Sequence, residues 1–238
     1  MQGSRVKLNI RHFLDCLVNS AECLLCGLPA GPHQNLCRHC WNSLPRVPAP
    51  CRLCGLPAPG GEDICPRCRH QAPPWQRMRA PLAFSGETRR LLLQLKYEER
   101  LMIANSFASR LWPLYADAKI DAVIPVPLHR ERLFERGFNQ ALLIARQLAW
   151  RLHRPVDHRS LQRLQATASQ TGLSRDQRRK NLRRAFVYKP RKPWKRIALI
   201  DDVITTGSTM EACCRPMRRS GIEYIEVWSI ARTLKQDD

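Results

Sequence analysis

Residues 196–210 read Arg-Ile-Ala-Leu-Ile-Asp-Asp-Val-Ile-Thr-Thr-Gly-Ser-Thr-Met, an apolar run followed by two carboxylates and a hydroxyl-rich turn. We expect a buried strand at 197–200 that delivers Asp201 and Asp202 to its carboxyl end, and a helix after the turn. In open α/β sheets ligands bind at that edge. The turn's backbone N–H groups, Gly207 and neighbouring hydroxyls would cradle a phosphate. The hydroxyls are those of Thr205, Thr206, Ser208 and Thr209.

The two carboxylates cannot be partners of that phosphate, because like charges repel. A carboxylate accepts two hydrogen bonds from a cis-diol, so Asp201 and Asp202 suit the vicinal hydroxyls of a ribose, with Mg²⁺ as a further ligand. An N-capped helix after a strand would explain one Asp or Ser but not the whole set. The stretch therefore predicts a sugar-phosphate site.

Around this stretch, strand-like and helix-like segments alternate from residue 86 to the end. Helical periodicity covers 87–116 as two helices, 137–152 and 208–221, and Pro216 should bend or shorten the last helix. Short apolar runs at 121–128, 185–188, 196–203 and 222–231 indicate strands. This alternation predicts an α/β domain over 86–238 with a largely parallel sheet.

Eight of the 11 cysteines form four Cys-x-x-Cys pairs, each ten residues from the next. The segment "CLLCGLPA" at Cys23 returns as "CRLCGLPA" at Cys51, which indicates an internal duplication. Two such pairs can complete a tetrahedral four-thiolate site, so we predict two structural zinc ribbons over 21–72. The ligands are Cys23, Cys26, Cys37 and Cys40 for one site, and Cys51, Cys54, Cys65 and Cys68 for the other.

Alternatives to this zinc arrangement stay open at the level of sequence. Interleaved pairing of the cysteines, an iron–sulfur cluster and a set of reduced structural thiols all fit the same residues. His39 lies between two ligands, and we expect it to face solvent. Residues 1–20 carry apolar residues at helical spacing and predict a helix, and the proline-rich segment 73–85 predicts an extended connector.

The formal net charge of +20 and a pI near 10.3 predict attraction to a polyanion. Nucleic acid is the favoured partner and anionic lipid the lesser one, while a merely solvated surface remains the plain alternative. No apolar run reaches the about 18 residues that a membrane span needs, and the amino-terminal segment lacks a signal-peptide core. We expect the protein in the cytoplasm.

Much of the charge lies in residues 151–196, which hold fifteen Lys or Arg against two Asp. Aromatic residues alternate with cations there, a pattern suited to single-stranded nucleic acid. In the alternative, Phe186 and Tyr188 turn into the core and only the charges face outward. The candidate binding residues are Arg183, Arg184, Lys189, Arg191, Lys192, Trp194 and Lys195.

The segment 197–209 resembles the phosphoribosyl-pyrophosphate (PRPP) motif of type I phosphoribosyltransferases. The order of motifs is similar to that of the ComF family, which includes GntX-type proteins. In this chain the motifs are, in order, the four cysteine pairs, "LKY" at 95–97, "PVPLHRERLFERGFNQA" at 125–141, "ASQTGLSRDQRRKNLRRAF" at 168–186 and the PRPP motif.

The resemblance implies a type I phosphoribosyltransferase fold behind a double zinc ribbon, and a role in DNA uptake, natural competence or use of DNA as a nutrient. It implies that PRPP with Mg²⁺ binds at 201–209, with the pyrophosphate near Lys96 and Arg130, helped by Arg132 and Arg136. It also implies a mobile loop at 168–186. Other DNA-uptake proteins are further candidate partners.

Three functions follow from this resemblance and from the charge. The first is a DNA-handling protein that binds single strands and PRPP. The second is an active phosphoribosyltransferase of unknown acceptor, with Asp201 and Asp202 as candidate catalytic residues. The third is a zinc-ribbon adaptor with a regulatory PRPP-binding domain. We favour the first.

Overall fold

The computed structural model describes residues 22–30, 35–164 and 185–234. The helix expected over residues 1–20 lies outside the described residues, as do Arg183, Arg184 and most of the loop expected at 168–186. Within the described ranges, no helix has the length and apolar character needed to span a membrane.

The centre of the fold is a sheet in which every paired strand is parallel. Its order is β1 (Arg77–Arg79), β7 (Tyr224–Arg232), β6 (Arg196–Ile204) and β3 (Ala122–Pro125), and β2 (Leu82–Ala83) also pairs with β7. The register places Ile197 opposite Ile225 and Ile200 opposite Trp228. Strands covered on both faces need continuous apolar runs, which 197–200 supplies. The predicted parallel α/β sheet is confirmed.

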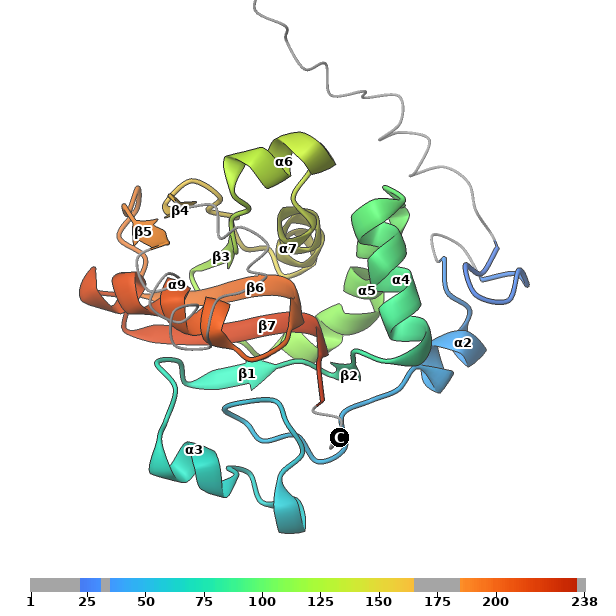
Figure 1. Cartoon of the computed structure of the whole chain (residues 1–238), viewed down its shortest axis with the longest axis horizontal. Helices are drawn as coiled ribbons and strands as arrows, with labels where there is room; N and C mark the ends of the chain where they lie inside the picture. The colour runs from blue at the N-terminus through green and yellow to red at the C-terminus, as the bar shows by residue number, and fades with distance from the viewer. Residues whose placement is uncertain (1–21, 31–34, 165–184, 235–238) are drawn as a thin grey trace, which may run out of the picture.

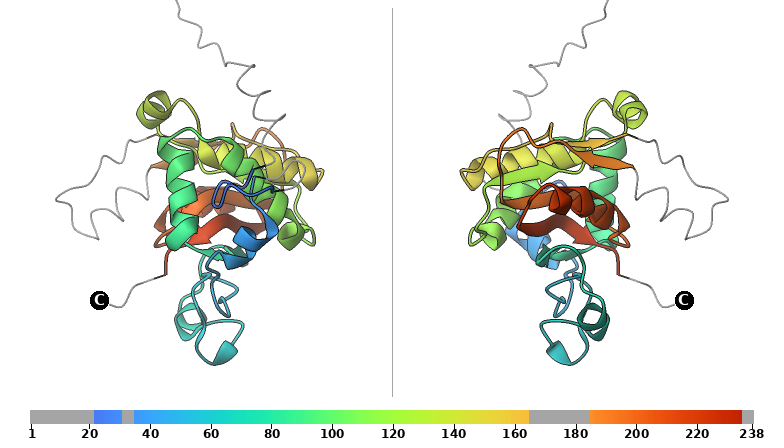
Figure 2. Two further views of the ribbon diagram at one scale, coloured as in Figure 1. Left: turned by 90° about the vertical axis from the view of Figure 1, so that its right-hand side faces the viewer. Right: turned by 90° about the vertical axis from the view of Figure 1, so that its left-hand side faces the viewer.

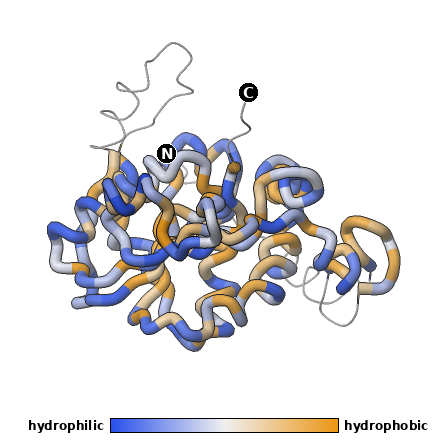
Figure 3. Tube along the Cα trace, turned by 90° about the horizontal axis from the view of Figure 1, so that it is seen from below, coloured by the Kyte–Doolittle hydropathy of each residue, from blue (hydrophilic) through white to orange (hydrophobic). Residues whose placement is uncertain are grey.

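Helices cover both faces of this sheet (Figure 1). They are α4 (Gly86–Tyr97), α5 (Met102–Leu111, continued by the 3-10 turn η2, Trp112–Tyr115) and α7 (Gln140–Arg151) on one face, and α9 (Ser208–Arg219) on the other. Ala198 and Ile200 pack with the first group, whereas Ile197 and Leu199 pack with α9. Along the helices hydrophilic and hydrophobic residues alternate in the way that one buried face requires (Figure 3).

Two smaller elements complete the α/β part. Helix α6 (Arg130–Arg136) follows β3 and has no buried residue. Strands β4 (Leu161–Arg163) and β5 (Phe186–Tyr188) form a separate antiparallel pair that packs on the α9 side. Phe186 and Tyr188 are buried in that core, so the alternative in which they turn inward is confirmed.

The two cysteine modules pack in different places. The first carries α2 (Arg38–Ser43), whose Cys40 and Trp41 join the core formed with α4, α5 and α7. The second carries η1 (Pro59–Gly61) and α3 (Pro66–His70), has its own small core and projects below the sheet (Figure 2). The segment expected as a connector at 73–85 contains β1 and β2, which pair with β7. The second module is therefore joined directly to the sheet.

Candidate zinc sites and sheet-edge ligand site

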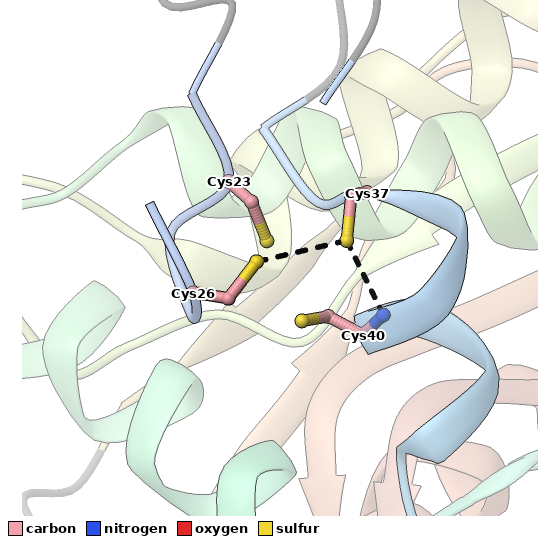
Figure 4. A group of neighbouring side chains, drawn as sticks. All are labelled: Cys23, Cys26, Cys37 and Cys40. Carbon is pink, nitrogen blue, oxygen red and sulfur yellow. Dashed lines mark hydrogen bonds between the residues drawn. The ribbon is translucent and has the colours of Figure 1, made fainter. Parts of the chain in front are cut away.

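The first zinc site is formed by Cys23, Cys26, Cys37 and Cys40, whose sulfur atoms all lie within 4.8 Å of one another. Their side chains point toward a common centre, and the Sγ atoms of Cys26 and Cys37 are 3.8 Å apart (Figure 4). A tetrahedral ion with metal–sulfur bonds of about 2.3 Å has sulfur–sulfur edges of about 3.8 Å. The geometry therefore fits zinc. His39 is exposed, as expected.

The second zinc site repeats the first. Cys51, Cys54, Cys65 and Cys68 are all buried and form the second group of sulfur atoms within 4.8 Å, with 3.8 Å between the Sγ atoms of Cys54 and Cys65. Both groups follow the consecutive partition of the cysteine pairs. Each module places its glycine just after the first pair in the left-handed region, with φ of +72° at Gly27 and +67° at Gly55.

Backbone amides lower the pKa of one thiol in each group. Burial raises the pKa of the Cys23 thiol, but hydrogen bonds, chiefly from backbone N–H groups, outweigh it and lower the pKa to about 6. At the equivalent position, the same balance lowers the pKa of Cys51 to about 7. In the same groups, burial and the neighbouring thiols raise the pKa of Cys40 and of Cys68, so the two modules also match in the thiols that shift upward. A thiolate is the form that ligates zinc.

The hydroxyl-rich turn lies where β6 meets α9. Gly207 caps the helix with φ of +83°, a conformation that favours glycine. The hydroxyls of Thr206 and Ser208 are 2.9 Å apart, and the backbone N–H of Ser208 donates to Thr206 Oγ1 at 3.3 Å. Thr205 and Thr206 are exposed. The turn therefore presents hydroxyls at the positive end of a helix dipole, an arrangement suited to an anion.

The two aspartates leave opposite sides of β6. Asp202 lies on the side of Ala198 and Ile200, beneath α4 and α7, and is only 3% exposed. Asp201 lies on the α9 side, and its Oδ1 accepts a hydrogen bond from the backbone N–H of Asp202 at 2.9 Å. The two carboxyl groups still interact, because the charge of Asp202 raises the pKa of Asp201. A shared diol for both carboxylates stays a prediction.

Asp202 belongs to a chain of polar contacts. The Nζ of Lys96, on α4, lies 2.6 Å from Asp202 Oδ2, and the Nε2 of Gln140, on α7, lies 3.5 Å from Asp202 Oδ1. Arg136 on α6 donates to Gln140 Oε1 at 2.9 Å and stacks over the ring of Tyr97. Three helices are thus connected to this strand end, and Lys96, predicted to reach a pyrophosphate, pairs with Asp202.

Asp201 lies in a different electrostatic environment. Burial raises its pKa well above the ordinary value, the charge of Asp202 adds to the shift, and Lys96 opposes it. Burial and the positive charge of Arg132 lower the pKa of Arg163, on β4, while the charges of Cys213 and Asp201 raise it. α6, β4 and β6 therefore bring Arg132, Arg163 and Asp201 close enough for their charges to interact.

The loop predicted to bind pyrophosphate connects β3 to α6. Asn139 fixes its start, because its Nδ2 donates to the Val126 carbonyl at 3.0 Å while its Oδ1 caps α7. Arg130 and Arg132 extend from α6 and are exposed, whereas Arg136 is half-buried against Gln140. The exposed arginines are thus available to a polyanionic ligand.

The basic segment after β5 is partly ordered by side-chain contacts. Trp194 is half-buried, its Nε1 donates to Asp157 Oδ2 at 3.1 Å, and Lys192 lies over its ring at 5.4 Å from the centroid. One face of the indole is therefore already covered by a cation. The cations of this segment that are exposed are Lys189, Arg191, Lys192 and Lys195.

Sequence reasoning missed Gln140, Arg163 and Arg232, which all reach the strand end from distant segments. Gln140 carries a weak signal, since it lies in the segment "GFNQA" that resembles the family. Arg163 and Arg232 are two of 40 Lys and Arg residues, and nothing in their neighbours marks them.

Taken together, these parts define a double-zinc-ribbon protein with a parallel α/β domain and a strand–turn–helix site at the end of β6. The double zinc ribbon domain matches as a family model over residues 13–69. Competence protein F of Haemophilus influenzae is 37% identical over 172 residues, which cover 68% of this chain and 75% of that protein. DNA utilization protein YhgH of Salmonella typhi is 34% identical over 244 residues, 97% of this chain and 95% of that protein.

The chain belongs to the ComF family, that of Competence protein F and DNA utilization protein YhgH. A solved orotate phosphoribosyltransferase from Aeropyrum pernix aligns with 59% of this chain and 62% of its own at 21% identity, with a TM-score of 0.34. The parallel sheet order and the double zinc ribbon define the fold of this chain.

Proposed function

We propose that this protein binds the 5-phosphoribosyl group of PRPP at the end of β6 and single-stranded DNA on its basic surface, in the cytoplasm. The observation that carries the first half is the Thr205–Thr209 turn, with hydroxyls at the start of α9, beside an acid that carries a raised pKa. Its relatives are named for competence and for DNA utilisation, and we infer a role of that kind for this chain.

In this proposal the turn holds the 5′-phosphate and the carboxylates serve the ribose. The N–H groups of the turn and the hydroxyls of Thr206 and Ser208 would donate to phosphate oxygens. Asp201 would accept hydrogen bonds from the ribose hydroxyls, and its buried charge would then be compensated by the ligand. Asp202 would act from the other side of β6, released from Lys96 when Lys96 turns to the anion.

The pyrophosphate half of PRPP would lie toward α6. Lys96 and Arg130 are the candidate cations, and an incoming pyrophosphate would compete with Asp202 for Lys96. Bound Mg²⁺ would neutralise part of the pyrophosphate charge and favour its departure if transfer occurs.

Single-stranded DNA binding is supported by charge. The exposed cations after β5 add to a chain whose formal charge is +20, and eight zinc-bound thiolates with two Zn²⁺ would leave it near +16. Because Phe186 and Tyr188 are buried, Trp194 is the stacking candidate that remains in this segment. We expect a largely electrostatic mode of binding.

Fluorescence anisotropy with labelled single strands at increasing salt tests the DNA half. We expect the logarithm of the association constant to fall linearly with the logarithm of the salt concentration. The reason is that Lys and Arg side chains release counterions from the strand when they bind its phosphates. Absent or salt-independent binding would contradict it.

An active phosphoribosyltransferase is the second candidate, favoured by the cations and the acid around one strand end. Pyrophosphate release from PRPP that is lost in Asp201→Ala and Asp202→Ala would support it. PRPP binding without release, and without DNA binding, would instead favour the zinc-ribbon adaptor with a regulatory PRPP-binding domain.

A further inference from the structure

The second zinc ribbon is linked to the turn that ends β6 through two side chains that contact both. The contact is made by two buried side chains, Trp75 and Arg232, which are 6% and 2% exposed. Each bonds to a backbone carbonyl of the first cysteine pair of that ribbon. The Nε1 of Trp75 donates to the Leu53 carbonyl at 2.6 Å, and the Nε of Arg232 donates to the Cys54 carbonyl at 2.9 Å.

The same two side chains touch the turn. The Nη1 of Arg232 donates to the carbonyls of Ile204, at 2.9 Å, and of Thr205. The Cη2 of Trp75 lies 3.8 Å from where a Cβ on Gly207 would be, so its ring packs against that glycine. One ring and one guanidinium therefore join residues 53–54 to residues 204–207.

Arg232 also determines which way the turn's amides face. In a trans peptide the N–H points opposite to the preceding carbonyl. Since Arg232 holds the carbonyls of Ile204 and Thr205, the N–H groups of Thr205 and Thr206 point to the side away from Arg232. Two adjacent N–H groups that face the same side are the kind of element from which a phosphate cradle of backbone amides is built.

The first zinc ribbon has no such role among the described residues. Its contacts run to α5, where Ser106 donates to Asn35 Oδ1 at 3.2 Å and Arg110 donates to the Leu36 carbonyl at 3.0 Å. The duplicated modules thus have different neighbours, and each serves as a control for the other.

We propose that the second zinc ribbon is the structural support of the phosphate turn, with Arg232 and Trp75 as positioning residues, and that the first ribbon is not. The functional consequence rests on the proposed PRPP site. Loss of metal from the second site would loosen the turn and weaken phosphate binding, whereas loss from the first would leave the turn unchanged.

Hydrogen–deuterium exchange of the zinc-loaded full chain tests this without any ligand. We expect Arg232→Met to raise exchange in peptides covering 204–209 by about tenfold or more, since it removes charged hydrogen bonds to two carbonyls of the turn. Trp75→Phe keeps one ring but loses both the bond to Leu53 and the Cη2 contact with Gly207, and it should also raise exchange there, by less than Arg232→Met. Arg110→Met removes the equivalent arginine–carbonyl contact of the first ribbon and should leave 204–209 unchanged.

Paired cysteine variants provide the second arm and remain informative if Arg232→Met fails to fold. Cys51→Ser with Cys54→Ser should raise exchange at 204–209, and Cys23→Ser with Cys26→Ser should not. The inference is overturned if exchange at 204–209 is the same in the two double cysteine variants. It is also overturned if exchange there is the same in Arg232→Met and Arg110→Met. PRPP titration of the wild-type chain is scored separately, so a failure to bind PRPP counts against the proposed function alone.

Discussion

Lys96 and Asp202 form a largely buried ion pair, with 2.6 Å between Nζ and Oδ2 and side chains that are 19% and 4% exposed. The pair joins the last turn of α4 to the end of β6. It therefore contributes both to the stability of the fold and to the charge at the candidate ligand site.

We expect Lys96→Met to destabilise the protein by about 3 kcal/mol, because removing one partner leaves a buried carboxylate uncompensated and Lys96 keeps some solvent contact. Urea unfolding at neutral pH measures this, with the exposed Lys189→Met as control. Adding Asp202→Asn to Lys96→Met should recover part of the loss. Equal stabilities of the two lysine variants would rule out a structural role for the pair.

Asp201 should make stability depend on pH. Burial raises its pKa above the ordinary 3.8, so its ionised form costs stability in the folded state. The stability that protonated Asp201 contributes to the folded state is fully present below pH 3.8. It is lost as the pH rises through the pKa that Asp201 has in the folded protein. Asp201→Asn lacks this loss, so its melting temperature should exceed that of wild type by a margin that widens as pH rises from about 4. An Asn variant that is less stable across the whole pH range would contradict this.

Metal analysis should find two zinc ions per chain. Cys26→Ser combined with Cys37→Ser should lower the content to one, because those thiols share a four-sulfur group. Cys213→Ala is the control, since Cys213 is a buried thiol outside both groups, and it should retain two. Loss of both ions from the first double variant would show that the sites do not fold independently.

DNA affinity should depend on the exposed cations after β5. Replacing Lys189, Arg191 and Lys192 by Ala should weaken single-strand binding and lower the slope of log affinity against log salt by about 2, at about 0.7 per phosphate contact. Arg89→Ala with Arg219→Ala removes exposed charge elsewhere and should change the slope less. The same slope change per charge in both sets would mean that binding is spread over the whole surface.

Much of the architecture is predictable because its signals are local. The cysteine spacing identifies both zinc groups, and the apolar run before Asp201 with Gly207 after it places β6, the turn and α9. The burial of Phe186 and Tyr188 follows from the period of two in a strand.

The remaining features depend on contacts between distant segments. β1 and β2 are too short, and too close to prolines, to be recognised as strands. Gln140, Arg163 and Arg232 acquire their roles only when three separate elements meet at the end of β6. The opposite orientation of Asp201 and Asp202, by contrast, follows from strand alternation and was open to prediction from the sequence.

Calorimetric titration with PRPP and Mg²⁺, in the presence and absence of an oligonucleotide, tests the central claim most directly. We expect the wild-type chain to bind PRPP, and Asp201→Asn and Gly207→Val to lose most of the affinity. The first loses the carboxylate's charge, and the second puts a β-branched residue at φ of +83° next to Trp75. Absence of binding by the wild-type chain, or undiminished binding by Gly207→Val, would contradict a phosphoribosyl site at this turn.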